Sequence, residues 1–239
     1  MRVISASLAL ALVAYATAVA APPPRETRPI MPPAAAGRHW RLVFDQEFNG
    51  TALDHRVWST RNGWTHQNGV TAHLGNVAVS GGHLILTLAS RWSGAELATR
   101  AFRLRVGEYV QARIEFAGAG STIYNWPAWW TAGPAWPAGG ENDIAEGMGQ
   151  LTINYHWPGG DLETGSVHGA WGDGFHTYGL YRGLRHSRVY WDGRLVRTYR
   201  TYDSGAPETL LLTLGEGNRI VTGVASEMVV DYIRAWAPA

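Results

Sequence analysis

Cysteine and lysine are both missing from this chain of 239 residues, so all 20 basic side chains are arginine. Without cysteine there can be no disulfide, no thiol nucleophile and no thiolate metal site. Several motifs are absent too: the Gly-x-Ser-x-Gly nucleophile elbow, the His-Glu-x-x-His zinc motif, the P-loop and the Gly-x-Gly-x-x-Gly dinucleotide fingerprint. The formal net charge is +1 and the arginines are dispersed, which argues against a nucleic-acid partner.

The first 37 residues have the composition of a processing signal followed by a tether. Arg2 precedes an apolar run from Val3 to Ala21, and this run contains Ala18-Val19-Ala20, a small-x-small pattern typical of a signal-peptidase site. Residues 1–20 are predicted to be a signal peptide, and residues 21–37, rich in proline and alanine, an extended tether. We expect a secreted, extracellular protein with no membrane partner after processing; the alternative is an uncleaved signal anchor.

Residues 38–239 are numerous enough for one domain with a substantial core. Apolar and polar residues alternate with period two in residues 84–88, 109–116 and 151–157, and no stretch shows a convincing amphipathic helix. Asp192-Gly193 is expected to close a hairpin within residues 189–199, and residues 228–236 are expected to form a closing strand. The pattern predicts an all-β fold, an antiparallel β-sandwich of the jelly-roll (concanavalin-like) type.

Three carboxylates stand within six residues of one predicted strand, at Glu141, Asp143 and Glu146. Glu141 and Asp143 share a strand face, whereas Glu146 would point to the other face unless an extra residue is accommodated. A β-bulge at Ile144-Ala145 would turn Glu146 back toward the other two. The two glutamate carboxyls could then approach to about 5–5.5 Å, the separation found in retaining glycosidases. The alternative is a solvated acidic strand without chemistry.

Aromatic residues surround this cluster, because Trp126, Trp129, Trp130, Trp136 and Trp157 all lie close to it in sequence. Some of these tryptophans are expected to be buried, and the others to form exposed aromatic surface, which normally marks a binding site. The next predicted strand carries Asn154 and His156 on its polar face. These two residues are predicted to line the same cleft as the carboxylates, with ordinary polar exposure as the alternative.

Several segments carry a resemblance to a known family. The most specific is Glu141-Asn142-Asp143-Ile144-Ala145-Glu146, which has the form Glu-x-Asp-x-x-Glu and follows the run Trp126-Pro127-Ala128-Trp129-Trp130. The others are Leu42 to Gly50, Leu53-Asp54 with Val57-Trp58, Gly107 to Arg113, Phe175 to Tyr178 and Asp231 to Arg234. With these segments the chain resembles glycoside hydrolase family 16, most closely its bacterial laminarinase-like branch. The match extends over nearly all of residues 38–239. The Glu-x-Asp-x-x-Glu motif is specific because it follows the tryptophan run at the family's spacing.

The resemblance implies roles for individual residues. Glu141 would be the nucleophile, Glu146 the general acid/base and Asp143 the helper between them, while Trp126 and Trp130 would stack on sugar rings. The crowding of three carboxylates supports these roles, because one pKa must rise and leave a protonated acid near neutral pH. The implied activity is retaining, endo-acting hydrolysis of β-1,3 or mixed β-1,3-1,4 glucan polysaccharides by a monomer that needs no cofactor for catalysis.

Other activities stay open at this point. They are a galactan-specific hydrolase, a transglycosylase, and a jelly-roll carbohydrate-binding module without turnover, because loop contacts rather than the catalytic strand select the sugar. The chain also departs from the family pattern at two places near the motif. Asn142 replaces a usual aliphatic residue and needs a hydrogen-bond partner on the core side. Asn154 stands where many members have histidine.

The resemblance further implies a structural calcium ion on the face away from the cleft. Glu47 and Asp231 would provide side-chain oxygens and Gly82 a backbone carbonyl, and hard oxygen ligands suit calcium. The alternative is that Glu47 and Asp231 are ordinary strand-end carboxylates.

Overall fold

The computed structural model describes residues 39–66, 68–216 and 226–239. The predicted signal peptide (1–20) and tether (21–37) lie outside these described residues. No helix in the described part of the chain is long and apolar enough to cross a membrane.

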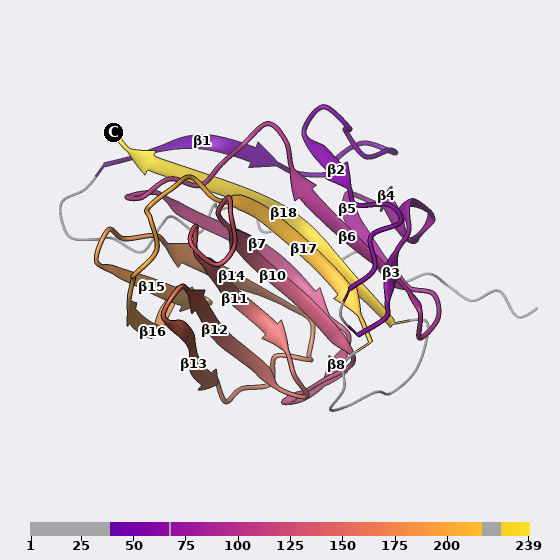
Figure 1. Ribbon diagram of the computed structural model, residues 1–239. Helices are drawn as coiled ribbons and strands as arrows, with labels where there is room; N and C mark the ends of the chain where they lie inside the picture. Colours follow the sequence, from indigo (N-terminus) through magenta and orange to yellow (C-terminus); the bar gives the residue numbers. More distant parts are fainter. Residues whose placement is uncertain (1–38, 67, 217–225) are drawn as a thin grey trace, which may run out of the picture.

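The described residues form two large β-sheets that pack face to face (Figure 1). The back sheet has the order β16 (Arg194–Arg200), β15 (His186–Trp191), β14 (Phe175–Tyr181), β7 (Tyr109–Phe116), β18 (Ser226–Pro238), β5 (His83–Leu88) and β4 (Val77–Ser80), with β1 (Trp40–Gln46) also paired to β18. The cleft sheet has the order β13 (Gly160–Ser166), β12 (Leu151–Trp157), β11 (Glu141–Gly147), β10 (Trp126–Ala132), β17 (Thr209–Gly215), β6 (Ser93–Thr99) and β2 (Trp58–Thr60). Smaller elements are β3 (Thr71–Ala72), the 3-10 helix η1 (Leu74–Asn76), and the pair β8 (Gly118–Ala119) and β9 (Thr122–Ile123).

The predicted fold class is confirmed, because both sheets are antiparallel and sandwich a single apolar core. Only β3 runs parallel to its partner, β6, among the strand pairs of the described residues. The core is built by the period-two pattern: Leu84, Leu86 and Leu88 of β5 are all fully buried. From the cleft sheet, Ile153 and Tyr155 of β12 point into the same core and are equally buried.

The predicted hairpin at Asp192-Gly193 is also confirmed. These two residues connect β15 to β16, and both have positive φ, 46° at Asp192 and 73° at Gly193. Positive φ at both central residues is the requirement of a type I′ turn, whose twist matches that of the flanking strands.

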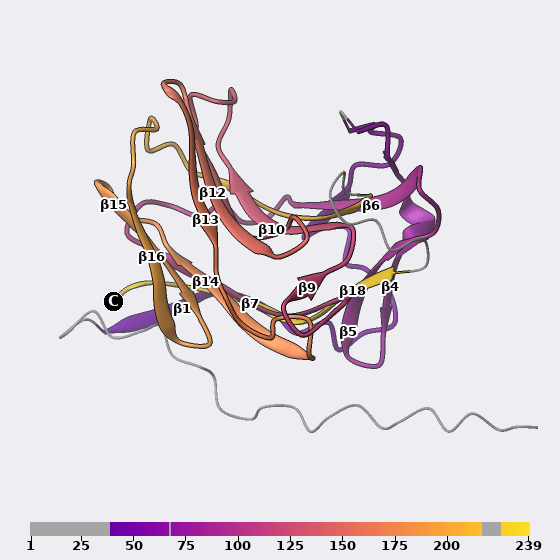
Figure 2. The same cartoon turned by 90° about the horizontal axis from the view of Figure 1, so that it is seen from below.

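The cleft sheet is curved, and its outer face lines the cleft of the molecule. Figure 2 shows the two sheets as two layers, with β12 and β13 rising on one side of this face and loops near residues 60–75 (purple) rising on the other. Strands β11, β10 and β17 form the floor between these walls. Side chains on the outer face of these three strands line one trough.

Candidate active site

A β-bulge in β11 places all three carboxylates on the outer face of the cleft sheet. In the β11–β12 register, Asp143 is opposite Asn154 and Glu146 is opposite Thr152, so Ile144 and Ala145 together face a single residue of β12. Both bulge residues are fully buried. The prediction of a bulge at Ile144-Ala145 is confirmed.

The bulge is supported from the back sheet. A bulge interrupts the strand ladder and leaves backbone groups that need other partners. Here the indole N–H of Trp191, on β15, donates a hydrogen bond of 3.0 Å to the carbonyl oxygen of Ile144. Because Trp191 is itself fully buried, its position fixes the bulge from beneath.

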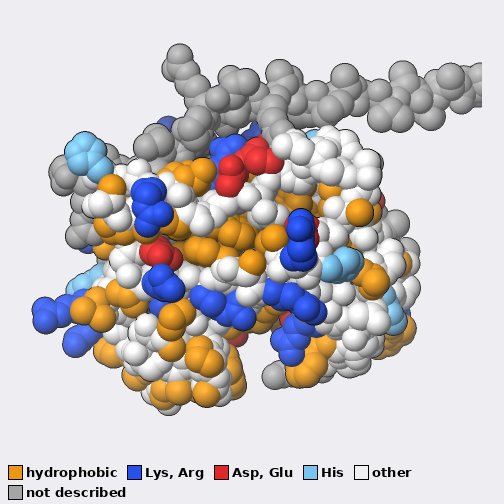
Figure 3. All heavy atoms as spheres, turned by 90° about the horizontal axis from the view of Figure 1, so that it is seen from above, with side chains coloured by type: hydrophobic (Ala, Val, Ile, Leu, Met, Phe, Trp, Pro, Cys, Tyr) orange, Lys and Arg blue, Asp and Glu red, His pale blue; other side chains and the backbone are white. Residues whose placement is uncertain are grey.

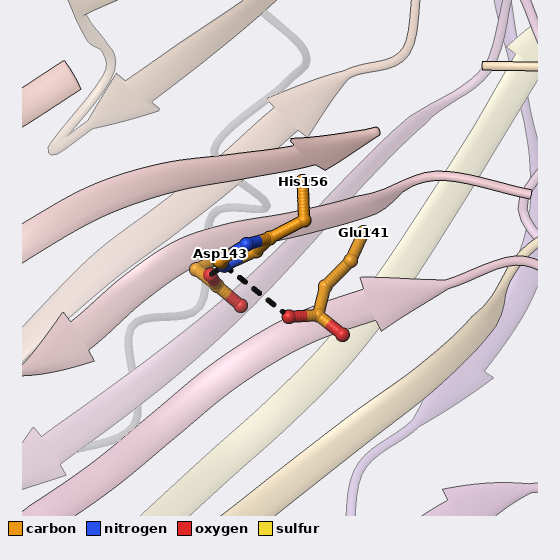
Figure 4. Close-up of side chains that lie close together, drawn as sticks. All are labelled: Glu141, Asp143 and His156. Carbon is orange, nitrogen blue, oxygen red and sulfur yellow. Dashed lines mark hydrogen bonds and ion pairs between the residues drawn. The ribbon is translucent and has the colours of Figure 1, made fainter. Parts of the chain in front are cut away.

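His156 connects the carboxyls of Glu141 and Asp143 (Figure 4). Its Nε2 lies 3.1 Å from Asp143 Oδ2 and 3.4 Å from Glu141 Oε1. Its Nδ1 lies 2.7 Å from Oδ1 of Asp161, which is directly opposite on β13. Hydrogen bonding to Asp143 is the main reason that the pKa of His156 is raised to about 10. His156 is therefore a cation at neutral pH, held between carboxylates on both sides.

Glu146 is held by two donors from neighbouring strands. The indole N–H of Trp126 donates to Oε1 and the amide of Asn154 donates to Oε2, each at 2.5 Å. These hydrogen bonds favour the ionised carboxylate, but burial is the larger effect and raises the pKa of Glu146 to about 7. Glu146 can thus hold a proton near neutral pH.

The other two carboxyls are also shifted upward. Burial, reinforced by the nearby charge of Asp143, raises the pKa of Glu141 to about 8. Burial raises the pKa of Asp143 as well, against the opposing effect of its hydrogen bond with His156. Three crowded carboxyls with raised pKa values, beside one cation, share their protons as a group. The site therefore contains both a protonated acid and a carboxylate at neutral pH.

The carboxyls lie on the floor of an elongated cleft made of two joined hollows. The smaller hollow, about 560 Å3, is lined by all three carboxyls together with Trp126, Trp130, Asn154 and His156. The larger hollow, about 960 Å3, extends over β17, β6 and β2. Both share His66, Trp130, Trp136 and Glu141, so they form one continuous trough. Every residue predicted to be catalytic or substrate-binding lies in this trough.

The tryptophan run of β10 alternates as expected. Trp129 is fully buried and donates to the carbonyl of Tyr178 at 3.2 Å. Trp130 is half-buried in the trough, where its indole N–H donates to the Thr213 hydroxyl at 2.8 Å. Trp126 lies on the same face, and its indole N–H donates to Glu146. Strand alternation alone does not reveal this contact.

Asn142 has the buried partners that its position requires. Its amide donates to both carboxyl oxygens of Glu208 at 3.0 Å, and its Oδ1 accepts a hydrogen bond of 2.6 Å from the Tyr199 hydroxyl. Glu208 is fully buried and also contacts Arg182 Nε at 2.8 Å and the Thr131 hydroxyl at 2.6 Å. This polar network lies inside the sandwich, on the opposite side of β11 from the carboxyl trio.

The residues predicted to bind calcium are engaged with arginines. Glu47 Oε1 lies 2.6 Å from Arg234, and Asp231 Oδ2 lies 3.0 Å from Arg113. Gly82 is in the turn between β4 and β5, with φ of 82°. Carboxylate oxygens are the right ligand type, but a metal ion would have to compete with two guanidinium groups for these carboxylates. Calcium binding stays a prediction.

Several residues of the trough were not identified from the sequence. Asp161 follows a Pro-Gly-Gly turn after Trp157, and the pairing across that turn would have placed it opposite His156. Trp136 belongs to the aromatic group noted in the sequence, but its contact with His156 was not foreseen: it is 60% exposed, and its ring centroid lies 6.5 Å from that of His156. Buried Glu96, with His66 Nε2 2.9 Å from its Oε2, has no signal in a single sequence, because the two residues are 30 positions apart.

No protein-family model matches the chain, and no curated protein matches it in sequence. Solved structures do match. The endo-β-1,3-glucanase of Pyrococcus furiosus aligns with a TM-score of 0.73 and 22% identity, over 85% of this chain and 96% of that one. The catalytic domain of an endo-1,3-β-glucanase (laminarinase) from Thermotoga petrophila aligns with a TM-score of 0.70 and 21% identity, over 84% and 99%.

A third similar structure is a family 16 endo-glucanase from Bacteroides ovatus in complex with G4G3G-2F-DNP. It aligns with a TM-score of 0.67 and 20% identity, over 80% of this chain and 99% of that one. At these identities the likeness establishes the fold. The chain has the jelly-roll fold of the endo-β-1,3(4)-glucanases, which agrees with the resemblance carried by its sequence motifs.

Proposed function

We propose that this chain is a glycoside hydrolase of family 16 that cleaves β-1,3 or mixed β-1,3-1,4 glucans internally and with retention. One observation carries the proposal: a bulge brings Glu141, Asp143 and Glu146 onto one face, on the floor of an open trough lined by tryptophans. An open trough suits attack within a long chain, and tryptophan faces suit the apolar faces of sugar rings.

In the proposed mechanism, protonated Glu146 transfers its proton to the glycosidic oxygen as the bond to the leaving sugar breaks. The Glu141 carboxylate attacks the anomeric carbon from the opposite face and forms a glycosyl ester. Glu146, now ionised, removes a proton from a water molecule, and the resulting attack releases the sugar with its original anomeric configuration and regenerates both groups. The assignment of nucleophile and acid/base follows the order of the Glu-x-Asp-x-x-Glu motif and not the pKa order of the free site, where the pKa of Glu141, about 8, lies above that of Glu146, about 7. Because the carboxyls share their protons as a group, the mechanism uses the form in which the proton is on Glu146 and Glu141 is ionised.

The neighbouring residues have supporting roles in this proposal. The His156 cation, held at Nδ1 by Asp161, offsets negative charge on Asp143 and Glu141 and so favours an ionised nucleophile. Trp126 and Asn154 keep the carboxyl of Glu146 in one orientation while it changes protonation. Orientation of this kind lowers the entropy lost on reaching the transition state.

A substrate panel tests the activity. Laminarin and mixed-linkage glucan should yield oligosaccharides of several lengths at early times, as internal cleavage requires. Agarose and carrageenan in the same panel identify a galactan hydrolase, and products longer than the starting oligosaccharide identify a transglycosylase. Binding without any product would leave the carbohydrate-binding module as the better interpretation.

Proton NMR of the first products tests the mechanism, because retention gives the β-anomer first. Azide distinguishes the two glutamates: with Glu146→Ala it should give a β-glycosyl azide, and with Glu141→Ala an α-glycosyl azide. An α-anomer as the first product of the parent would contradict the assignment of Glu141 as nucleophile. We also propose that the enzyme is secreted, with a mature N-terminus near Ala21, which N-terminal sequencing of extracellular protein would test.

A further inference from the structure

The larger hollow of the trough is lined by positively charged side chains, which a neutral sugar chain does not need for binding. Three arginines line it, Arg61, Arg100 and Arg103, and the hollow continues into the carboxyl trio through Glu141. Figure 3 shows arginine side chains gathered on this side of the molecule, beside a notch between two lobes at the lower edge of the view.

The three arginines differ in how their charge is balanced. Arg61 Nη1 lies 3.1 Å from buried Glu96, and its guanidinium stacks 4.1 Å from the centroid of Trp64, so this charge is already paired. Arg100 has one weak contact, 3.4 Å from Nη2 to the Ser59 hydroxyl. Nη1 of Arg103 donates hydrogen bonds to three backbone carbonyls, those of Thr99, Arg100 and Phe102.

Arg100 and Arg103 therefore have only neutral partners, and within the described residues no carboxylate lies within ion-pair distance of either. Both side chains are exposed at the edge of the hollow. A guanidinium presents its N–H groups in a planar fork that matches the oxygens of a carboxylate or a sulfate ester. Two such groups on the rim of one hollow are suited to an anion on the ligand.

The same hollow offers aromatic surface, which indicates that the anion belongs to a sugar. Trp136 is 60% exposed there, Trp64 is 49% exposed with one face covered by Arg61, and Trp130 forms part of the floor. Aromatic faces bind the C–H faces of sugar rings, whereas a free inorganic anion makes no favourable contact with them. Because Glu141 lines both hollows, a single polysaccharide chain can extend from this surface to the carboxyl trio.

We infer that the β6 side of the cleft is a subsite for a sugar residue that carries an anionic substituent, a sulfate ester or a carboxylate, bound by Arg100 and Arg103. This inference rests on the proposed glycosidase function and specifies its substrate further. The preferred polysaccharide then bears negative charge on residues to one side of the cleaved bond, while the residue at the acidic trio is uncharged.

The test measures binding in the Glu146→Gln background, so that the polymer is not cut. The probes are laminarin, carboxymethylated laminarin and sulfated laminarin of the same chain length, compared by affinity electrophoresis and calorimetry. We expect at least one charged derivative to bind about tenfold more tightly than neutral laminarin at 50 mM salt, and the preference to shrink at 500 mM. The derivative with the larger ratio identifies the anion as carboxylate or sulfate.

Arginine variants assign the preference to the site. Arg100→Gln/Arg103→Gln should bring the ratio of charged to neutral affinity close to one. Arg41→Gln/Arg185→Gln removes the same charge from two exposed arginines outside the cleft and should retain the ratio. If the Arg103 change disturbs folding, Arg100→Gln alone replaces the double variant in this comparison, because it loses only the contact with Ser59.

Equal affinity of the parent background for charged and neutral laminarin would overturn the inference. So would a preference that survives in the Arg100 variants, or one that the control variant loses to the same extent. Cleavage of neutral laminarin by the unmodified protein is measured separately, and its absence would count against the proposed function. The affinity ratios test the anion subsite independently of cleavage.

Discussion

Replacing Asn142 by alanine should destabilise the protein strongly, although the residue lies outside the cleft. The change removes the acceptor of the Tyr199 hydroxyl and the amide donor shared by the two oxygens of Glu208. A buried group without a partner costs about 1–3 kcal/mol, and a hydrogen bond to a charged group contributes about 1.5–3 kcal/mol. We expect the free energy of unfolding to fall by about 3–5 kcal/mol, or the melting temperature by about 6–20 °C for a domain of this size.

Urea unfolding at pH 8 measures this loss, because burial raises the pKa of Glu208 only to about 7 and the carboxylate is then ionised. Asn62→Ala is the matched control: the same truncation at an exposed site, where Leu74 N–H can turn to water, should cost about 0.5 kcal/mol or less. Adding Tyr199→Phe to Asn142→Ala should restore about 1–2 kcal/mol by removing the orphaned hydroxyl. An Asn142→Ala protein as stable as the control, or no recovery in the double variant, would refute the reasoning.

The remaining predictions concern the trio and the metal. Asn154→Ala removes a donor that lowers the pKa of Glu146, so that pKa should rise and the alkaline limb of the kcat/KM profile should move to higher pH; a move to lower pH would contradict the assigned contact. His156→Ala removes the cation that lowers the pKa of the carboxyls, so the acid limb of the kcat/KM profile should move up by about one pH unit. The rate at pH 6 should then fall about tenfold, whereas His156→Arg, which keeps a positive charge, should retain part of that rate. Calcium should raise the melting temperature relative to chelator in the parent but not in Glu47→Ala/Asp231→Ala, and a parent insensitive to chelator would exclude a stabilising ion.

The fold and the central trio could be predicted because both follow from local spacing. Period-two alternation in β5 and β12 identifies which side chains enter the core, and Asp192-Gly193 identifies a turn. The bulge could be predicted because three carboxylates at positions 141, 143 and 146 can share a face only if one residue is extra. In each case the information lies within about ten residues.

Contacts between distant segments could not be predicted in the same way. That Asn142 needs a partner follows from its position, but the identity of Glu208 depends on how the chain returns 66 residues later. The raised pKa of Glu141 depends on burial by neighbours that alternation does not specify. Likewise, Arg100 appears in the sequence as one of many dispersed arginines, and only the folding of β6 beside β17 places it at the edge of the cleft.

The bulge has a consequence for length changes in β11. Because Ile144 and Ala145 together face one residue of β12, deleting Ala145 would leave Asp143 opposite Asn154 and Glu146 opposite Thr152, with both carboxylates still facing outward. A single-residue deletion in the middle of a core strand normally inverts every side chain beyond it. Here the loss would fall on one buried methyl group and on the hydrogen bond from Trp191 to the Ile144 carbonyl. The register therefore allows this strand two lengths with the same pairing to β12, so a residue can be lost between Glu141 and Glu146 while both side chains keep the same face.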